Sequence, residues 1–227
     1  MHNTFLPAPL LANVFLLKHN NSTGSSFLIH YNGEKFLLSA KHLFPGLANA
    51  SSIEFEFSRN KIWNKKSGIG YIHENPNVDV IAIKINEFEG LDGYNFADIG
   101  GVTAFSDSGF FVGFPLGISG EDLSNVNNAF PIPLIKGAIY SGFTDIGGIS
   151  VELLDGHNNP GFSGGPVFFR SLTEGQQPVW KLLSIVSAYI NQNNELVTPF
   201  GNLQYTTNSG IIISYGVRFI KEMLDNI

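Results

Sequence analysis

Short apolar segments separated by turn-forming residues run through most of this chain, and they predict β-strands. Ile53 to Phe57 alternates strictly between apolar and polar positions, which is the period of a strand with one buried face. Asn32-Gly33 lies between two apolar runs and indicates a tight hairpin. The other predicted strands are Val14 to Leu17, Phe27 to His30, Lys35 to Ser39, Val78 to Ile85, Phe110 to Pro115, Lys136 to Phe143, Ile149 to Leu154, Val167 to Phe169, Trp180 to Ile190 and Gly210 to Ser214.

Helical spacing appears at the C-terminal end, where Val217, Ile220 and Leu224 recur on one face. We expect a closing helix at about residues 215–225. A parallel α/β sheet is disfavoured because helical patterns do not alternate with the strands. The sequence therefore predicts an all-β protein with a C-terminal helix.

The strands fall into two sets, and the weakly patterned region from Glu87 to Gly101 is interpreted as the connection between them. Ser119 to Asn128 is polar and is expected to form a loop. Two sets of short strands with turn signals predict two antiparallel barrels. We place the first in residues 10–98 and the second in residues 99–227.

Composition narrows the possible partners and chemistry. The chain has 227 residues, of which 43% are hydrophobic and 14% charged, as in globular proteins. A net charge of −6 without a basic block argues against nucleic acid as a partner. The absence of Cys excludes disulfides, thiolate metal sites and a Cys nucleophile. Leu10 to Leu17 is too short for a membrane span and lacks a preceding basic segment, so we expect neither a membrane anchor nor a signal peptide, and a cytoplasmic location.

Glycines surround Ser163 in the run Gly161-Phe162-Ser163-Gly164-Gly165-Pro166. Glycine permits positive φ and lets a ligand approach backbone N–H groups. Such a turn exposes a Ser hydroxyl and aims two amides at one point beside it, which gives acyl transfer a nucleophile and an oxyanion hole. The same run is also compatible with a tight turn that enters a strand, so the motif alone leaves both interpretations open.

A nucleophilic Ser needs a base, and the base needs an orienting acid. His42 stands out among the six His residues because it follows a predicted strand end in Ser39-Ala40-Lys41-His42. Asp79 stands out because a turn delivers it to the head of an apolar strand, where a carboxylate is costly to bury unless it is paired. Taken separately, each is also compatible with an ordinary surface or turn residue.

Taken together, these residues resemble the chymotrypsin-like (trypsin-fold) serine proteases. The order His42, Asp79, Ser163 is that of the family. The resemblance extends from about Val14 to Leu224, and within it Val112 to Pro115 resembles the Gly-hydrophobic-Pro segment of Cys-free bacterial members. The segments that carry it are Phe36 to His42, Asp79 to Ile83, Gly161 to Pro166, Leu183 to Ser187, Gly210 to Leu224 and Val112 to Pro115.

The resemblance implies a serine endopeptidase that needs no cofactor or metal and acts on a protein or peptide substrate. Ser163 would be the nucleophile, His42 the base and Asp79 the residue that orients it. The N–H groups of Gly161 and Ser163 would form the oxyanion hole. The remaining matches are Ser187, which would support the buried acid, His157 and Asn158, which would lie near the base of the S1 pocket, and Tyr189 and Gly210, which would form its walls.

Two departures from the family pattern affect regulation and specificity. Phe162 stands where secreted, zymogen-activated members have an Asp that pairs with a newly cut N-terminus, so we expect no activation by that route. His157 stands where an Asp gives trypsin-like members their preference for Arg or Lys, so a basic P1 residue is not supported. Two hypotheses replace it: His157 favours an acidic or polar P1, or Tyr189 narrows the pocket for small side chains.

Other classes of function are weighed against this one. The main alternative is a latent or inactive protease-fold binding module that is activated by a partner protein or docks to one. An activating or inhibitory partner would also restrain an enzyme without a zymogen switch. A metal-dependent hydrolase is disfavoured because there is no His-Glu-x-x-His and the His residues are scattered singly.

Overall fold

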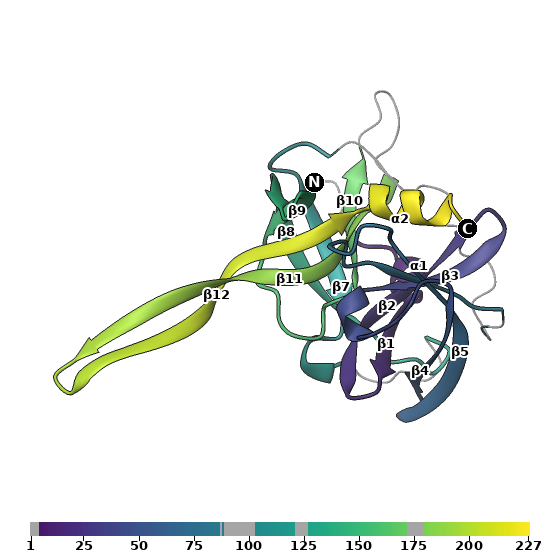
Figure 1. Cartoon of the computed structure of the whole chain (residues 1–227), viewed down its shortest axis with the longest axis horizontal. Coiled ribbons are helices and arrows are strands. Elements are labelled where there is room, and N and C mark those ends of the chain that lie inside the picture. Colours follow the sequence, from purple (N-terminus) through teal and green to yellow (C-terminus); the bar gives the residue numbers. More distant parts are fainter. Residues whose placement is uncertain (1–4, 87, 89–102, 121–126, 172–178) are drawn as a thin grey trace.

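Two closed antiparallel barrels of six strands each form the body of the protein (Figure 1). The computed structural model describes residues 5–86, 88, 103–120, 127–171 and 179–227. A short helix, α1 (Ala8–Leu11), precedes the first barrel, whose strand order is β1-β2-β3-β6-β5-β4. Its strands are β1 (Val14–His19), β2 (Ser22–Tyr31), β3 (Glu34–Ser39), β4 (Ser51–Arg59), β5 (Ile62–Ile72) and β6 (Ile81–Lys84).

The second barrel has the order β10-β11-β12-β9-β8-β7 and is followed by the helix α2 (Val217–Leu224). The predicted all-β fold of two barrels with a C-terminal helix is therefore confirmed. The chain that joins the barrels lies outside the described residues except for Phe88, so the boundary between residues 98 and 99 stays a prediction. The strands are β7 (Ser108–Gly113), β8 (Leu134–Ile146), β9 (Ile149–Asp155), β10 (Pro166–Ser171), β11 (Val179–Thr198) and β12 (Gly201–Gly216).

Several elements differ from their predicted bounds. The strand predicted from Val78 to Ile85 pairs with its neighbours only within β6. Asp79 therefore lies in the irregular segment before that strand. The helix begins at Val217 because Tyr215 and Gly216 still pair with β11. The loop predicted at residues 119–128 is described only at its ends. Strand β5 was not predicted because its first half is exposed on both faces and shows no apolar alternation.

Apolar side chains form three buried clusters, one inside each barrel and one between them. The cluster between the barrels joins Phe27 and Val80 of the first barrel to Phe114 and Phe168 of the second. Helix α2 contributes its buried face, Phe219, Ile220, Met223 and Leu224, to the same cluster. The relative position of the barrels is thus fixed by a continuous apolar core.

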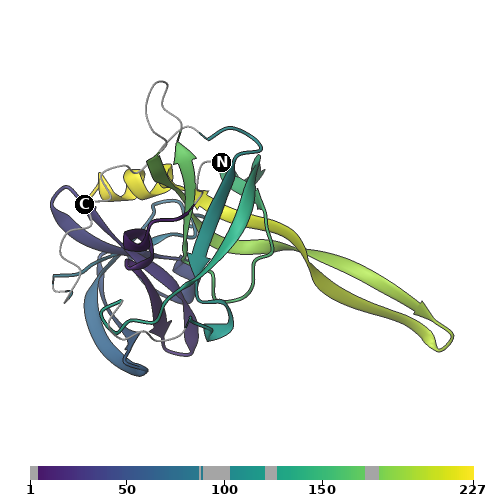
Figure 2. The ribbon, with the colours of Figure 1, turned by 180° about the vertical axis from the view of Figure 1, so that it is seen from behind.

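Strands β11 and β12 extend well beyond the second barrel as a long hairpin (Figures 1 and 2). Their pairing continues from Asn191 with Asn208 to Thr198 with Gly201. The sequence predicted strands only up to Ile190 and from Gly210 onward. The missing part is rich in Asn, Gln and Thr, and its residues are not drawn into a core, so no buried apolar face marks it in the sequence.

Phe162 anchors the turn that carries Ser163 to the core of the second barrel. Its side chain is completely buried, and its ring lies edge-on to that of Phe111 with the ring centroids 4.7 Å apart. The Nζ atom of Lys136 lies 5.6 Å from the centroid of the Phe162 ring. An apolar contact therefore holds this position, at which an Asp would instead require a buried charged partner.

We expect Phe162→Ala to lower the free energy of unfolding by about 3–5 kcal/mol, the range for removing a buried aromatic ring. Urea denaturation measures the change. Phe200→Ala is the matched control, because Phe200 is fully exposed and its loss should stay within about 0.5 kcal/mol. Equal effects of the two substitutions would contradict the anchoring role of Phe162.

Candidate active site

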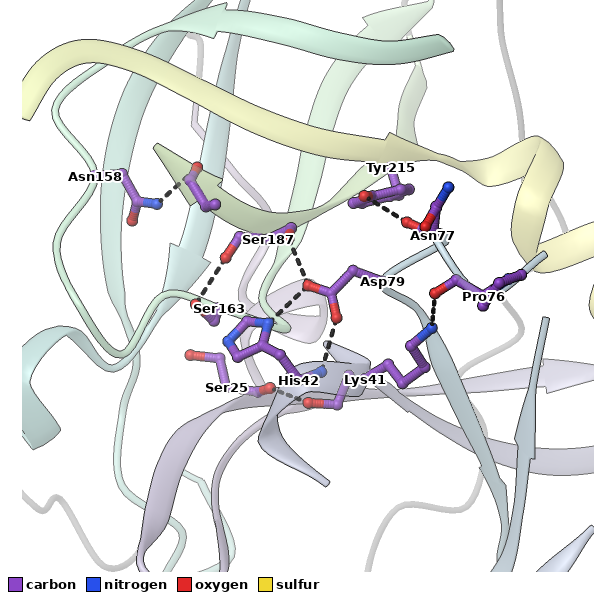
Figure 3. Close-up of polar contacts among 12 residues, drawn as sticks. Ser25, Lys41, His42, Pro76, Asn77, Asp79, Asn158, Ser163, Ser187 and Tyr215 are labelled. Carbon is purple, nitrogen blue, oxygen red and sulfur yellow. Dashed lines mark hydrogen bonds and ion pairs between the residues drawn. The ribbon is translucent and has the colours of Figure 1, made fainter. Parts of the chain in front are cut away.

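The Asp79 carboxylate binds His42 through two hydrogen bonds (Figure 3). The backbone N–H of His42 donates to Oδ1 of Asp79 over 2.7 Å, and the ring Nδ1 lies 2.7 Å from Oδ2. An ionised carboxylate only accepts hydrogen bonds, so the proton lies on Nδ1. In the neutral ring, Nε2 is then left with a free lone pair, which is the form that a general base requires.

Ser187 supplies a further donor to Asp79, because its hydroxyl donates to Oδ2. The Asp79 side chain is only 16% exposed, and its three hydrogen bonds offset the cost of burying a charge. Tyr215 lies close by and donates its hydroxyl to the Asn77 carbonyl over 2.9 Å. Burial and the negative charge of Asp79 raise the pKa of Tyr215, so this phenol stays neutral beside the carboxylate.

The hydroxyl of Ser163 donates to the backbone carbonyl of Ser187 over 2.9 Å. Ser187 therefore contacts Asp79 with its side chain and Ser163 with its main chain. Figure 3 shows the ring of His42 between Asp79 and Ser163. The two barrels thus bring the three predicted residues His42, Asp79 and Ser163 into one site, with the Ser163 hydroxyl turned toward the Ser187 carbonyl.

In the turn that carries Ser163, two backbone carbonyls accept hydrogen bonds, and this fixes the direction of the N–H groups of the residues that follow them. The Pro160 carbonyl accepts from Leu116 N over 2.7 Å, and the Phe162 carbonyl accepts from Gly165 N over 2.8 Å. In a trans peptide the N–H points opposite to the carbonyl. The N–H groups of Gly161 and Ser163 therefore point to the other side, and neither has a hydrogen-bond partner among the described residues.

Ser25 of β2 connects this turn to the first barrel and is completely buried. Its hydroxyl donates to the Gly161 carbonyl over 2.7 Å and accepts from Phe114 N at 2.9 Å. Its own backbone N–H donates to the Ser163 carbonyl over 2.8 Å. Ser25 was not predicted from the sequence, because a Ser in a strand carries no signal until its partners from the second barrel are known.

Gly161 and Gly164 are required by close backbone contacts, at Gly161 within the second barrel and at Gly164 with the first barrel. Gly161 has a φ of +103°, and a Cβ there would lie 2.3 Å from the Phe114 carbonyl oxygen. Gly164 has a φ of +84°, and its Cβ would lie 2.1 Å from the Ser25 carbonyl oxygen. Both the positive φ and the lack of space therefore exclude a side chain at these positions.

Asn158 lies beside β11, next to the site. It is 2% exposed, its Nδ2 donates to the Ala188 carbonyl over 3.3 Å, and its own carbonyl accepts from the side chain of Asn208. Its Oδ1 is buried without a partner among the described residues. An unpaired acceptor is thus available at the position predicted for the base of the pocket.

The other residues predicted for the pocket lie around Asn158 but make different contacts. The side chain of His157 is exposed, and its carbonyl accepts from Lys136 Nζ over 2.8 Å. Tyr189 pairs with Ile212 of β12. The Gly210 carbonyl accepts from Gly156 N over 2.8 Å. Their roles in substrate binding stay predictions.

The parts of the chain that the structure describes contain neither a metal-binding cluster of side chains nor a membrane-spanning helix. No three His, Asp or Glu side chains there are grouped so as to hold a metal ion. No helix there has the length and apolar character needed to cross a membrane.

Comparison with known proteins gives a likeness in structure but none in sequence. No protein-family model matches the chain, and no curated protein matches it. The HtrA-type protease AlgW, solved with a tripeptide, superposes with a TM-score of 0.62 and 17% identity over 97% of this chain and 61% of AlgW. The chain thus spans less than two thirds of the length of AlgW.

Two further structures match over more of their own length. An inactive form of Rv3671c from M. tuberculosis H37Rv gives a TM-score of 0.57 and 14% identity over 97% of this chain and 88% of Rv3671c. The MamO protease domain from Magnetospirillum magneticum gives 0.54 and 15% over 96% of this chain and 97% of that domain. At these identities the likeness shows the fold. The two barrels and the closing helix therefore give this chain the fold of the chymotrypsin-like serine proteases.

Proposed function

We propose that this protein is a serine endopeptidase that cleaves peptide bonds through an acyl-enzyme intermediate. The observation that carries the proposal is the meeting of a carboxylate-bound His42 with Ser163 beside two unpartnered N–H groups. Nucleophile, base, orienting acid and oxyanion donors are the four parts that acyl transfer by a Ser requires. The shared fold with HtrA-type proteases adds support.

In the acylation step, Ser163 Oγ attacks the scissile carbonyl carbon while its proton passes to Nε2 of His42. Asp79 holds the ring and stabilises the imidazolium that forms. The carbonyl oxygen becomes negative and accepts from the N–H groups of Gly161 and Ser163. One such donor contributes about 3–4 kcal/mol to transition-state stabilisation.

The tetrahedral intermediate collapses when His42 returns the proton to the leaving amine and the C–N bond breaks. The acyl group then remains on Ser163 as an ester. Water attacks this ester with its proton passing to His42, and the oxyanion hole is used again. When the second tetrahedral intermediate collapses, His42 returns this proton to Ser163 Oγ and the carboxylic acid leaves, so atoms and protons balance over the cycle.

The alternative function is a latent protease-fold module that docks to a partner protein or is activated by one. It is favoured by one observation, the hydrogen bond from Ser163 to the Ser187 carbonyl in place of one to His42. Rotation about a single side-chain torsion moves the hydroxyl to another staggered position, and such rotations are fast in folded proteins. The hydrogen bond is therefore a small barrier, and we place the enzyme first.

Labelling with a fluorophosphonate probe tests the proposal. We expect the probe to modify Ser163, and we expect Ser163→Ala and His42→Ala to abolish labelling because the nucleophile or its base is lost. Ser141→Ala is the control, since Ser141 is an exposed Ser on β8. Peptide mapping by mass spectrometry locates the label. A folded wild-type protein that stays unlabelled would contradict the enzyme and favour the latent module.

We expect Ser25→Ala to lower kcat by about tenfold, less than the 10²–10³ lost with an oxyanion donor itself. The substitution leaves the Gly161 carbonyl unheld, so the donor beside it is less well oriented, while KM should not change. Ser26→Ala is the matched control, because Ser26 is equally buried but its hydroxyl donates to Phe15 O in the first barrel. Both variants should lose about 1 kcal/mol of stability. Equal kcat values for the Ser25→Ala and Ser26→Ala variants would refute a positioning role for Ser25.

The P1 preference is proposed to follow from His157 or Tyr189. An exposed His157 imidazole suits an acidic or polar P1 side chain, whereas Tyr189 on the wall would select small side chains. We expect few cleavages after Arg or Lys, because a His, His157, and not an Asp stands at the position predicted for the pocket base. Sequencing the products from a denatured protein mixture measures this, and a dominant basic P1 would contradict both ideas.

A further inference from the structure

One edge of β11 has no strand partner from Ser187 to its end. On one side, β11 pairs with β12 along its length from Ser184 to Thr198. On the other side, its ladder with β10 ends at Ile185, and only Val186 still bonds to Gly164 and Gly165. Beyond that point, no described segment pairs with this edge, and Figures 1 and 2 show the hairpin clear of both barrels.

The open edge begins in the candidate active site. Its first two carbonyls are already engaged, because Ser187 O accepts from Ser163 and Ala188 O accepts from Asn158 Nδ2. The pairing with β12 shifts register between Val186 and Ala188 and again between Tyr189 and Asn191, and it is regular from Asn191 to Thr198. In that regular part, alternate residues direct their N–H and C=O groups to the open edge, which continues for about 25 Å at about 3.3 Å per residue.

We propose that the projecting part of this edge, Asn191 to Thr198, binds an extended polypeptide substrate as an added β-strand, upstream of the residues held beside Ser163. The inference rests on the proposed function and names its substrate class: a chain that offers about a dozen extended residues on the N-terminal side of the scissile bond. The direction follows from the pairing. β11 runs away from Ser163, so an antiparallel partner, like every pair in both barrels, runs toward Ser163 and reaches it with its C-terminal end.

The composition of the projecting part suits such a ligand. Glu195 is the one charged residue between Asn191 and Asn208, so neither sign of charge on the substrate is excluded. The distal end carries exposed apolar side chains, with Val197 72% and Phe200 100% exposed. Backbone pairing gives affinity with little sequence preference, and the apolar end favours an apolar residue far upstream of the cleaved bond.

Stability also favours a third strand. A two-stranded hairpin that projects into solvent is marginally stable alone, and three strands are needed for independent stability. A bound substrate segment supplies the third strand and satisfies the open N–H and C=O groups. The stabilisation of the hairpin by this third strand then contributes to the affinity for the substrate.

Peptides of graded length test the inference. They share one scissile sequence and carry 4, 8 or 12 residues on its N-terminal side. We expect kcat/KM of the wild type to rise about tenfold or more from the shortest to the longest, through KM, as several edge hydrogen bonds are added. In a variant that lacks Gln192 to Thr207, with Asn191 joined to Asn208 by Asn-Gly, we expect no rise. Asn191 and Asn208 are paired, so a two-residue turn closes this variant.

N-methylated peptides test the same point with the protein unchanged. Methylation of the alternate backbone amides that face the edge of β11 should remove the gain in kcat/KM. Methylation of the intervening amides, which point away from that edge, should preserve the gain. An equal gain for the shortened variant, or equal effects of the two methylation patterns, would overturn the inference. It is also overturned if light scattering shows that the hairpin instead joins two copies of the chain at assay concentrations.

Two measurements separate this inference from the proposed function. Fluorophosphonate labelling of Ser163 should proceed equally in the wild type and the shortened variant, because the nucleophile is retained in both. Fluorescence anisotropy with the Ser163→Ala protein measures the length dependence of binding without turnover. Absent labelling refutes the enzyme alone, whereas labelling without length-dependent binding refutes the edge site alone.

Discussion

The structure depends on a small hydrogen-bonded contact between the two barrels, centred on Ser25. One residue of β2 holds the Gly161 carbonyl, the Phe114 N–H and the Ser163 carbonyl at once. If the barrels separated, all three hydrogen bonds would be lost together. The conformation of the turn from Gly161 to Ser163 is for this reason tied to the docking of the barrels.

This contact explains why the candidate catalytic groups come from different halves of the chain. His42 and Asp79 belong to the first barrel, whereas Ser163 and Ser187 belong to the second. The apolar cluster between the barrels brings them together but has no directional preference, because dispersion and burial depend little on orientation. The hydrogen bonds of Ser25 and Ser187 supply the orientation, and the glycines at 161 and 164 permit the close approach that these bonds need.

The sequence predicted the parts of this arrangement that are local. The two-barrel fold follows from strand and turn patterns, and His42, Asp79 and Ser163 stand in short segments whose residue types reflect their own surroundings. Ser25 was missed because its role depends on atoms more than 80 residues away, such as Phe114 N. The position of the Ser163 hydroxyl was missed because it is set by the Ser187 carbonyl, which lies on strand β11 of the same barrel. The local sequence around a residue does not show which distant groups it contacts in the folded protein.

The hairpin was missed for a different reason, and that reason bears on its role. A strand inside a barrel is detectable because burial selects apolar residues at alternate positions, whereas the residues from Gln192 to Thr207 pair with each other and join no apolar cluster. An open edge of this length is usually protected by charges, Pro or a covering segment, because it otherwise pairs with other chains. Here Glu195 is the one charge, and Pro199 lies in the turn between the strands, where it blocks neither edge. An edge left unprotected near Ser163 is best understood as a surface for capturing an extended chain.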